Sequence, residues 1–302
     1  MTTELTPTTD PRRTLASQAA GIDRTRPIAA AQYLDFTALP ATTTDAGDTW
    51  TTRGQNAVVH HVAARRPGTV VDTTFSSETV LILTDTAAAA DVTWEGTTTA
   101  LAGHGVAVLP PGAVRLDNTG TADLTLLVRS DEPGWAGRAS NAAAFAEPSP
   151  RVAPAEPWPA PPGPERVRFY RAEDHPLEQG RFGRIFRSRS FMVNLLAAHD
   201  GPRPADTLSP HHHDDFEQYS LATHGHYTHH IRTPWVTDRN HWREDEHVGV
   251  ASPSLTVIPP PTVHTSEADG PGENRLIDIF CPPRADFSAK PGWVRNAEDF
   301  PA

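Results

Sequence analysis

The chain has 302 residues, a formal net charge of −11 and a pI of about 5.7. An acidic surface repels phosphate backbones, so nucleic acid is not expected as a partner. No apolar run approaches the roughly 20 residues of a membrane span, and the start of the chain lacks the charged and apolar regions of a signal peptide. One cysteine, Cys281, excludes an intramolecular disulfide. We therefore expect a cytoplasmic protein.

Proline and glycine are frequent, at 30 and 20 residues, and the apolar runs are short and rich in Val, Thr and Ile. Both features favour short strands joined by turns over long helices. We therefore predict an all-β protein. Residues 1–27 are polar and are expected to form a flexible N-terminal arm. Strand-like runs then follow one another from about residue 48 to residue 130, a pattern typical of a sandwich or barrel.

A proline-rich segment divides the chain. Eight prolines lie between Pro148 and Pro164. Since proline cannot donate a hydrogen bond to a neighbouring strand, we predict an extended linker or strap over residues 136–165. A second series of strand-like runs follows it. The predicted organisation is one β domain over residues 28–135 and a second over residues 166–302.

The stretch "HHHDDFE" carries the strongest functional signal. His211 and His213 share a face in a strand, and Glu217 follows on the same parity if the strand stays regular. His264 lies far downstream, after "VIPPPTV", where a turn can return it to the same place. Three imidazoles and one carboxylate suit Fe, Mn, Co, Ni, Cu or Zn. His212 replaces one of its neighbours if the strand bulges.

These residues resemble the two motifs of the cupin family. "HHHDDFE" matches the first motif through His211, His213 and Glu217, and "PPPTVH" matches the second motif, which ends at His264. One departure is that Gly225 lies one residue later after the glutamate than is usual. The resemblance implies a small antiparallel β-barrel that holds one divalent metal on these four positions. Fe(II) or Mn is the expected metal, with Zn or Ni as alternatives.

The N-terminal half repeats the scheme without its ligands. "DTTFSSE" spaces Asp72, Thr74 and Glu78 as the histidine motif does, and "PPGAVR" places Arg115 where His264 would stand. Arginine stays protonated and cannot bind a cation, so we expect Arg115 to pair with Glu78 or Asp72 inside the barrel. The chain therefore resembles a two-domain cupin, with a degenerate N-terminal domain, a proline-rich linker and a metal-binding C-terminal domain.

The strand-like run "HYTHHIRT" is expected to line the pocket with one of its two faces. One face carries His226 and His230, and the other carries Tyr227 and His229. Tyr219 is expected to line the same cavity. We predict Tyr219, His226 and His230 as general acid or base residues beside the metal.

A long charged loop, residues 232–249, carries Trp235 and Trp242. A loop of this length at the mouth of a barrel is a candidate lid or dimer contact, and a plain surface loop is the alternative. Cupins often form homodimers through edge strands, so the resemblance also implies a homodimer.

Three functional classes remain open. A cupin of this kind can be an Fe(II)-dependent dioxygenase, a redox-neutral isomerase or lyase in which the metal polarises a carbonyl, or a non-catalytic binding module. The complete ligand set argues against the third class. The resemblance slightly favours the dioxygenase, whereas the polar pocket favours an isomerase or lyase on a sugar or keto-acid. In each case the expected substrate or ligand is a polar, oxygenated small molecule.

Overall fold

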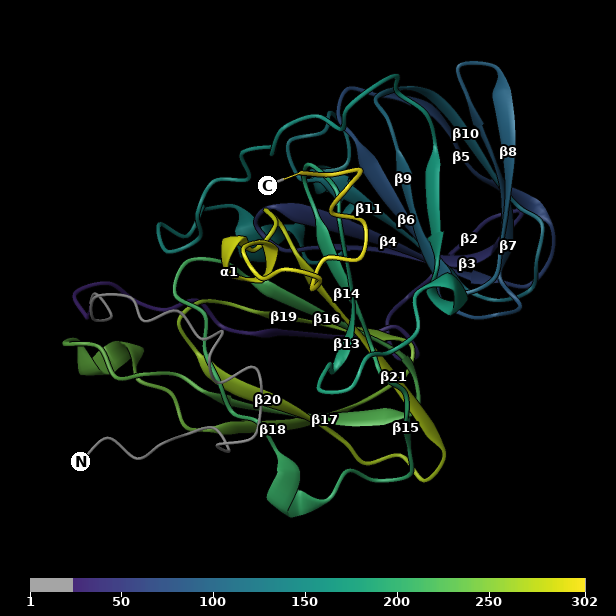
Figure 1. Cartoon of the computed structure of the whole chain (residues 1–302). Helices are drawn as coiled ribbons and strands as arrows, with labels where there is room; N and C mark the ends of the chain where they lie inside the picture. Colours follow the sequence, from purple (N-terminus) through teal and green to yellow (C-terminus); the bar gives the residue numbers. More distant parts are fainter. Residues whose placement is uncertain (1–23, 302) are drawn as a thin grey trace.

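Two large antiparallel sheets lie at the centre of the molecule (Figure 1). The structure, a computed structural model, describes residues 24–301. The first large sheet contains, in order, β12 (Arg168–Arg171), β9 (Gly105–Leu109), β6 (Thr79–Leu83), β11 (Leu124–Arg129), β4 (Ala57–Ala64), β3 (Gly47–Arg53) and β2 (Thr42–Thr43). The second contains β1 (Gln32–Asp35), β19 (Ser254–Ile258), β16 (Gln218–His224), β21 (Glu273–Phe280), β14 (Met192–Leu196) and β13 (Gly183–Arg187), with β15 (His199–Asp200) beside β21.

Two smaller sheets complete the architecture. One contains β5 (Gly68–Phe75), β10 (Gly112–Asn118), β7 (Ala89–Trp94) and β8 (Thr97–Ala102). The other contains β18 (Glu246–Ala251), β17 (His226–Arg232) and β20 (Val263–Ala268). Among residues 24–301, helical structure is limited to short turns: η2 (Ala136–Arg138), η3 (Ala142–Phe145), η4 (Ala172–Asp174), η5 (Ala205–Thr207), η6 (Arg239–His241) and α1 (Ala285–Ser288). The protein is therefore mostly β, as predicted.

The two large sheets repeat one strand order. In the N-terminal half this order is β9, β6, β11, β4 and β3, and in the C-terminal half it is β19, β16, β21, β14 and β13. At one edge each sheet takes a strand from the other half. Gln32 of β1 pairs with Val257 of β19. Arg168 of β12 pairs with Val108 of β9. One edge strand of each large sheet therefore lies on the other side of the predicted domain boundary.

One face of each large sheet packs into a core that both halves share. Its N-terminal members include Val59, Val80, Ile82, Val106, Val108 and Leu127, and its C-terminal members include Val193, Leu195, Tyr219, Leu221, Leu255, Val257, Ile277 and Ile279. The opposite face of the first sheet packs against the four-stranded sheet through a second apolar core, which includes Val58, Leu81, Leu83, Leu109, Val114, Leu116 and Leu126. Because β6 and β9 are buried on both faces, "TVLIL" and "GVAVL" are continuous apolar runs rather than alternating ones.

Two buried glutamates connect the halves. The Glu217 carboxylate, directly before β16, accepts hydrogen bonds from the Gln55 backbone N–H at 2.7 Å and from the Tyr219 hydroxyl at 2.7 Å. Glu78, directly before β6, accepts one from the Arg189 backbone N–H at 2.8 Å. Each carboxylate thus reaches the turn between two strands of the opposite half. Burial raises the pKa of both groups.

The Tyr219 hydroxyl completes the first of these contacts. It donates to Glu217 and accepts from the backbone N–H groups of Asn56 at 3.3 Å and Ala57 at 3.2 Å. A Cβ atom on Gly54 would lie 2.4 Å from the hydroxyl oxygen, so the turn needs glycine there. Tyr219 therefore lies in the core between the halves, and its position does not fit the predicted catalytic role.

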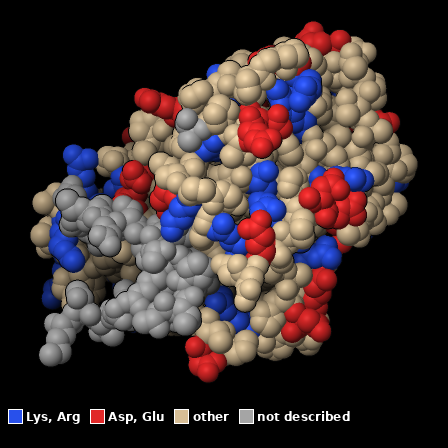
Figure 2. All heavy atoms as spheres, viewed as in Figure 1, with Lys and Arg blue, Asp and Glu red and all other residues tan. Residues whose placement is uncertain are grey.

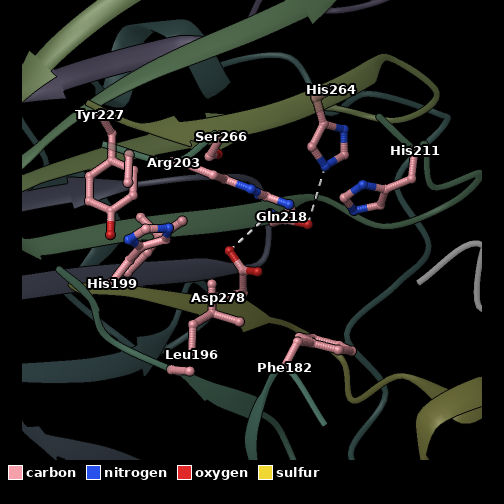
Figure 3. A pocket seen from close by; sticks show the side chains of 13 residues that line it. Phe182, Leu196, His199, Arg203, His211, Gln218, Tyr227, His264, Ser266 and Asp278 are labelled. Carbon is pink, nitrogen blue, oxygen red and sulfur yellow. Dashed lines mark hydrogen bonds between the residues drawn. The ribbon is translucent and has the colours of Figure 1, made fainter. Parts of the chain in front are cut away.

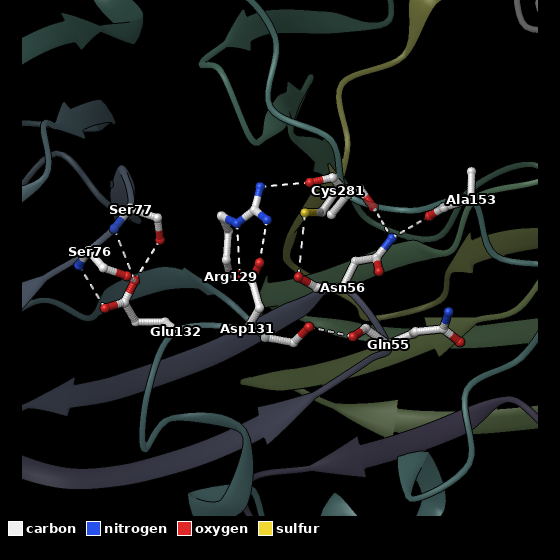
Figure 4. Close-up of polar contacts among 11 residues, drawn as sticks. Gln55, Asn56, Ser76, Ser77, Arg129, Asp131, Glu132, Ala153 and Cys281 are labelled. Atoms are coloured by element: carbon white, nitrogen blue, oxygen red, sulfur yellow. Dashed lines mark hydrogen bonds and ion pairs between the residues drawn. The ribbon is translucent and has the colours of Figure 1, made fainter.

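The proline-rich segment runs as a strap along both halves. The backbone N–H of Ser140 donates to the Thr51 carbonyl at 2.9 Å, and that of Ala153 donates to the Asp215 carbonyl at 2.6 Å. Figure 4 shows the Asn56 amide, which donates to the Ala153 carbonyl at 2.8 Å. These contacts show that the segment packs against both halves.

The predicted flexible arm, residues 1–27, lies outside the described residues except for its last four. In that part, the Arg24 guanidinium donates to the Trp235 carbonyl at 2.7 Å. Within residues 24–301, no helix has the length and apolar character needed to cross a membrane. Basic and acidic side chains are interspersed on the face shown in Figure 2.

Replacing Tyr219 with Phe should lower the free energy of unfolding by about 1–3 kcal/mol, because Glu217 and two backbone N–H groups then lose a buried partner. Urea unfolding followed by circular dichroism measures this loss. Tyr33→Phe is the matched control, since the Tyr33 hydroxyl donates to the partly exposed Glu246 at 3.0 Å and water can replace it there. Equal losses for the two variants would contradict the structural role of Tyr219.

Candidate metal centre

Three histidines from two parts of the chain converge inside the C-terminal half. Two backbone hydrogen bonds, at 3.0 and 2.8 Å, join His211 to His264 of β20. The His213 ring stacks on Phe216 with 4.5 Å between ring centroids. One nitrogen of each of the three imidazoles lies within 4.8 Å of the other two. All three side chains are buried, so the predicted histidines do form one cluster.

Backbone carbonyls orient two of the imidazoles. The Nδ1–H of His211 donates to the Ser209 carbonyl at 2.8 Å, and that of His264 donates to the Thr262 carbonyl at 3.1 Å. A carbonyl only accepts, so Nδ1 of each ring carries a proton, and in the neutral ring Nε2 then carries the lone pair. Burial holds the pKa of His213 well below its usual value, and its Nδ1 has no hydrogen-bond partner among the described residues. Three neutral, buried imidazoles are a donor set that fits a divalent transition metal.

Glu217 is not part of this cluster. The chain bends after the histidine motif, so the strand parity assumed for Glu217 is lost and its carboxylate turns toward the other half. The next residue, Gln218, faces the histidines instead. Its Oε1 lies 2.9 Å from His213 Nε2 and 3.2 Å from His264 Nε2. Gly225 lies one residue later after Glu217 than is usual in the motif, whereas its distance from residue 218 equals the usual interval. The position of Gly225 was therefore the sequence signal for residue 218.

A buried network holds the Gln218 side chain, and Figure 3 shows its contact with Asp278. Its Nε2 donates to Asp278 Oδ1 at 2.9 Å and to Ser220 Oγ at 3.0 Å, and the Ser220 hydroxyl donates to Asp278 at 2.9 Å. Because a carboxylate only accepts, the NH₂ group of the Gln218 amide must face Asp278. The amide oxygen therefore faces the histidines. The sequence signal for Asp278 was a single carboxylate within the apolar run "LIDIF".

The cluster opens onto a cavity of about 270 Å³, with His211, Gln218 and His264 in its wall (Figure 3). The other polar groups that line the cavity belong to His199, Arg203, Tyr227, Ser266 and Asp278. Its apolar wall contains Phe182, Leu196, Ala197, Ala268 and Leu276. Apart from Tyr227, no sequence motif had marked the polar residues, because they come from loops and strands far apart in the chain.

The inward face of β17 is the one that carries Tyr227 and His229. Tyr227 lines the cavity, and His229 is fully buried. His226 and His230 lie on the opposite face, where both contact carboxylates. The prediction of His226 and His230 as catalytic residues therefore does not fit the structure. The bulky residues that alternate along the other face were the signal that it is the buried one.

The N-terminal half does not reproduce the site. The Arg115 guanidinium lies 3.1 Å from the Asp72 carboxylate, which is one of the two predicted pairings. The pair lies outside the barrel, because the Asp72 and Arg115 side chains are 64% and 48% exposed. Val114 and Leu116, on either side of Arg115, are buried. Glu78, the other predicted partner, belongs to the contact between the halves. The second motif is therefore out of register in β10, and apolar side chains fill the interior.

None of the residues 232–249 lines the cavity. Trp235 and Trp242 stack on each other with 4.6 Å between ring centroids and remain 62% and 41% exposed. The loop thus lies away from the candidate site, and its position does not support the predicted lid. His212 is also outside the cluster, because its side chain is 33% exposed beside Asp214.

Comparison with protein-family models gives no match, and neither does comparison with curated proteins. Solved structures do match. Oxalate decarboxylase of Lactobacillus farciminis, in its formate complex, is 10% identical over 92% of this chain and 89% of that chain, with a TM-score of 0.56. A putative glyoxylate-induced protein of Pseudomonas aeruginosa is 15% identical over 88% and 94%, with a TM-score of 0.50. AerE from Microcystis aeruginosa is 8% identical over 85% and 99%, with a TM-score of 0.51. These likenesses, all at 15% identity or less, show a shared fold.

Replacing His213 with Ala should reduce bound metal to less than about one tenth of an equivalent, because one of three neutral donors is removed. Replacing Glu217 with Gln should leave metal content unchanged, since that side chain faces the other half. Elemental analysis of untagged protein purified without chelator measures both. Asp72→Ala is the control in the N-terminal half and should also retain metal. Loss of metal from Glu217→Gln but not from His213→Ala would contradict this assignment.

Proposed function

We propose that the protein is a mononuclear metal-dependent enzyme built from two cupin barrels, of which the C-terminal one carries the active site. His211, His213 and His264 would hold one divalent transition metal, with Fe(II) or Mn expected and Zn or Ni as alternatives. The reaction is a redox-neutral lyase or isomerase reaction on a small oxygenated or carboxylated molecule. The observation that carries this proposal is the opening of a buried, neutral triad of histidines onto a polar cavity.

The two-barrel part of the proposal is supported by the repeated strand order of the two large sheets. Each large sheet also has a smaller sheet in the same half of the chain. Apolar side chains fill the interior of the N-terminal half, whereas the interior of the C-terminal half holds the polar cluster. One barrel therefore serves as a support, and the other serves as the site.

The residues around the cavity fit substrate binding and proton transfer. A bound divalent metal would polarise a carbonyl or carboxylate oxygen of the substrate as a Lewis acid. The Arg203 guanidinium offers a fixed positive charge for a carboxylate. The hydroxyl of Tyr227 and the imidazole of His199 can give or take a proton in the same cavity. About 270 Å³ of space limits the substrate to a small molecule.

The donor set favours redox-neutral chemistry over the dioxygenase reaction that the sequence slightly favoured. An imidazole binds a metal as a neutral ligand, and the one glutamate of the motif, Glu217, lies outside the cluster. An anionic ligand stabilises the higher oxidation state of a metal, so its absence makes oxidation of the divalent ion less favourable.

The Fe(II)-dependent dioxygenase remains the second candidate function. The apolar wall of Phe182, Leu196 and Leu276 favours it, because dioxygen is an apolar molecule that needs a dry site beside the metal. The two functions share their histidines, so only the stoichiometry of oxygen separates them.

Small hydroxy-acids and keto-acids, incubated with Mn- or Fe-loaded protein under argon, should be converted without oxygen, and NMR spectroscopy of the mixture measures this turnover. Tyr227→Phe should lower kcat by about 100-fold or more and change KM little, because the ring stays and only the proton-carrying hydroxyl is lost. His226→Ala, on the outer face of the same strand, is the control and should retain full activity. Turnover that consumes one oxygen molecule per substrate would instead establish the dioxygenase.

A further inference from the structure

The Gln218 amide is held in one orientation beside the histidine cluster. Its amide is buried, its nitrogen is bound by Asp278 and Ser220, and its oxygen is left facing His213 and His264. The amide cannot turn over without placing its N–H₂ group against two imidazoles and its oxygen against a carboxylate. The network therefore fixes which atom the histidines meet.

The contact between His264 and Gln218 brings two acceptors together. His264 Nδ1–H donates to the Thr262 carbonyl, so in the neutral ring Nε2 carries a lone pair. This Nε2 lies 3.2 Å from Gln218 Oε1. Two acceptors at this distance repel each other, and a cation that binds both removes the repulsion. Two ligands that bind one metal at about 2.1 Å and at right angles lie about 3.0 Å apart. The observed separations of 2.9 and 3.2 Å from Oε1 to the two imidazoles fit such neighbouring ligands.

We propose that Gln218 is the fourth protein ligand, a neutral one that binds the metal through Oε1, and that the site therefore selects an anionic carboxylate on its open positions. The inference rests on the proposed function. Asp278 and Ser220 act as positioning residues, because they present the oxygen of the amide to the metal. A glutamate at this position would place its negative charge on the metal. Here the nearest negative charge of the network belongs to Asp278, which lies behind the Gln218 amide.

The corresponding place in the N-terminal half shows that the fold itself does not require this network. Thr79 follows the buried Glu78 as Gln218 follows Glu217. Leu81 pairs there with Leu126, where Ser220 pairs with Asp278 in the C-terminal half. The polar network is thus confined to the half that holds the histidine cluster.

The selection of an anion follows from the charges in the cavity. Four neutral ligands leave the metal with its two positive charges, and the Arg203 guanidinium lines the same cavity. Asp278 offsets only one of these charges. A carboxylate that binds the metal is therefore attracted by a net positive site, in a cavity where the low dielectric strengthens that attraction.

The test exchanges the positions of the amide and the carboxylate. Gln218→Glu combined with Asp278→Asn keeps the total charge and the hydrogen bond between the two side chains but places the carboxylate on the metal. Calorimetric titration with Co(II) should show about tenfold tighter binding than in the unchanged protein, and acetate should bind the Co(II) form about tenfold more weakly. Gln218→Ala should weaken Co(II) binding by about 10- to 100-fold and change its visible absorption spectrum, which reports the ligand set.

Thr79→Val is the matched control, because it changes the corresponding buried position of the other half and should leave both titrations unchanged. Circular dichroism confirms that each variant is folded before titration. If Gln218→Ala binds Co(II) with unchanged affinity and spectrum while His213→Ala does not bind it, Gln218 is no ligand and this inference is wrong, although the metal site stands. If the unchanged protein binds no Co(II), the proposed function fails together with it.

Discussion

The packing of the two large sheets on a shared apolar core is the constraint on which the site depends. This packing fixes the face of the sheet on which each side chain of β16 lies. Tyr219 and Leu221 lie in the core between the halves, whereas Gln218 and Ser220 face the interior of the C-terminal half. Glu217 turns to the first side, where it binds the opposite turn. Because the core cannot slide without exposing all of these side chains, the amide beside the histidines is held in place by the contact between the halves.

The sequence predicted the strand-rich fold because strands leave local patterns, and it predicted the histidine cluster because a local histidine pair and a distant second motif together resemble one family. Short apolar runs between prolines and glycines mark strands, and a histidine pair two residues apart marks one face. The error at Glu217 arose where the strand bends after His213, since parity holds only along a regular strand. Asp278 and Arg203 could not be predicted by spacing, because sheet pairing and a loop bring them to the cavity from distant parts of the chain.

The polar interior of the C-terminal half has a cost that the N-terminal half helps to offset. Ser220 and Asp278 stand where Leu81 and Leu126 stand in the other half, so about 3–6 kcal/mol of apolar burial is given up at this pair alone. Hydrogen bonds within the network satisfy these groups but add little net stability. The shared core and the exchanged strands β1 and β12 join the C-terminal half to the N-terminal one.

This difference between the halves explains why one interior can differ from the other without loss of the fold. The N-terminal half has the buried glutamate before β6, although its described residues form no histidine cluster, so that carboxylate serves the contact between the halves. Glu217 has the same task. With the glutamate committed to the contact between the halves, the position that faces the histidines falls to residue 218, and an amide there needs no counter-charge when the metal is absent. A carboxylate at residue 218 would face Asp278 at hydrogen-bond distance and repel it.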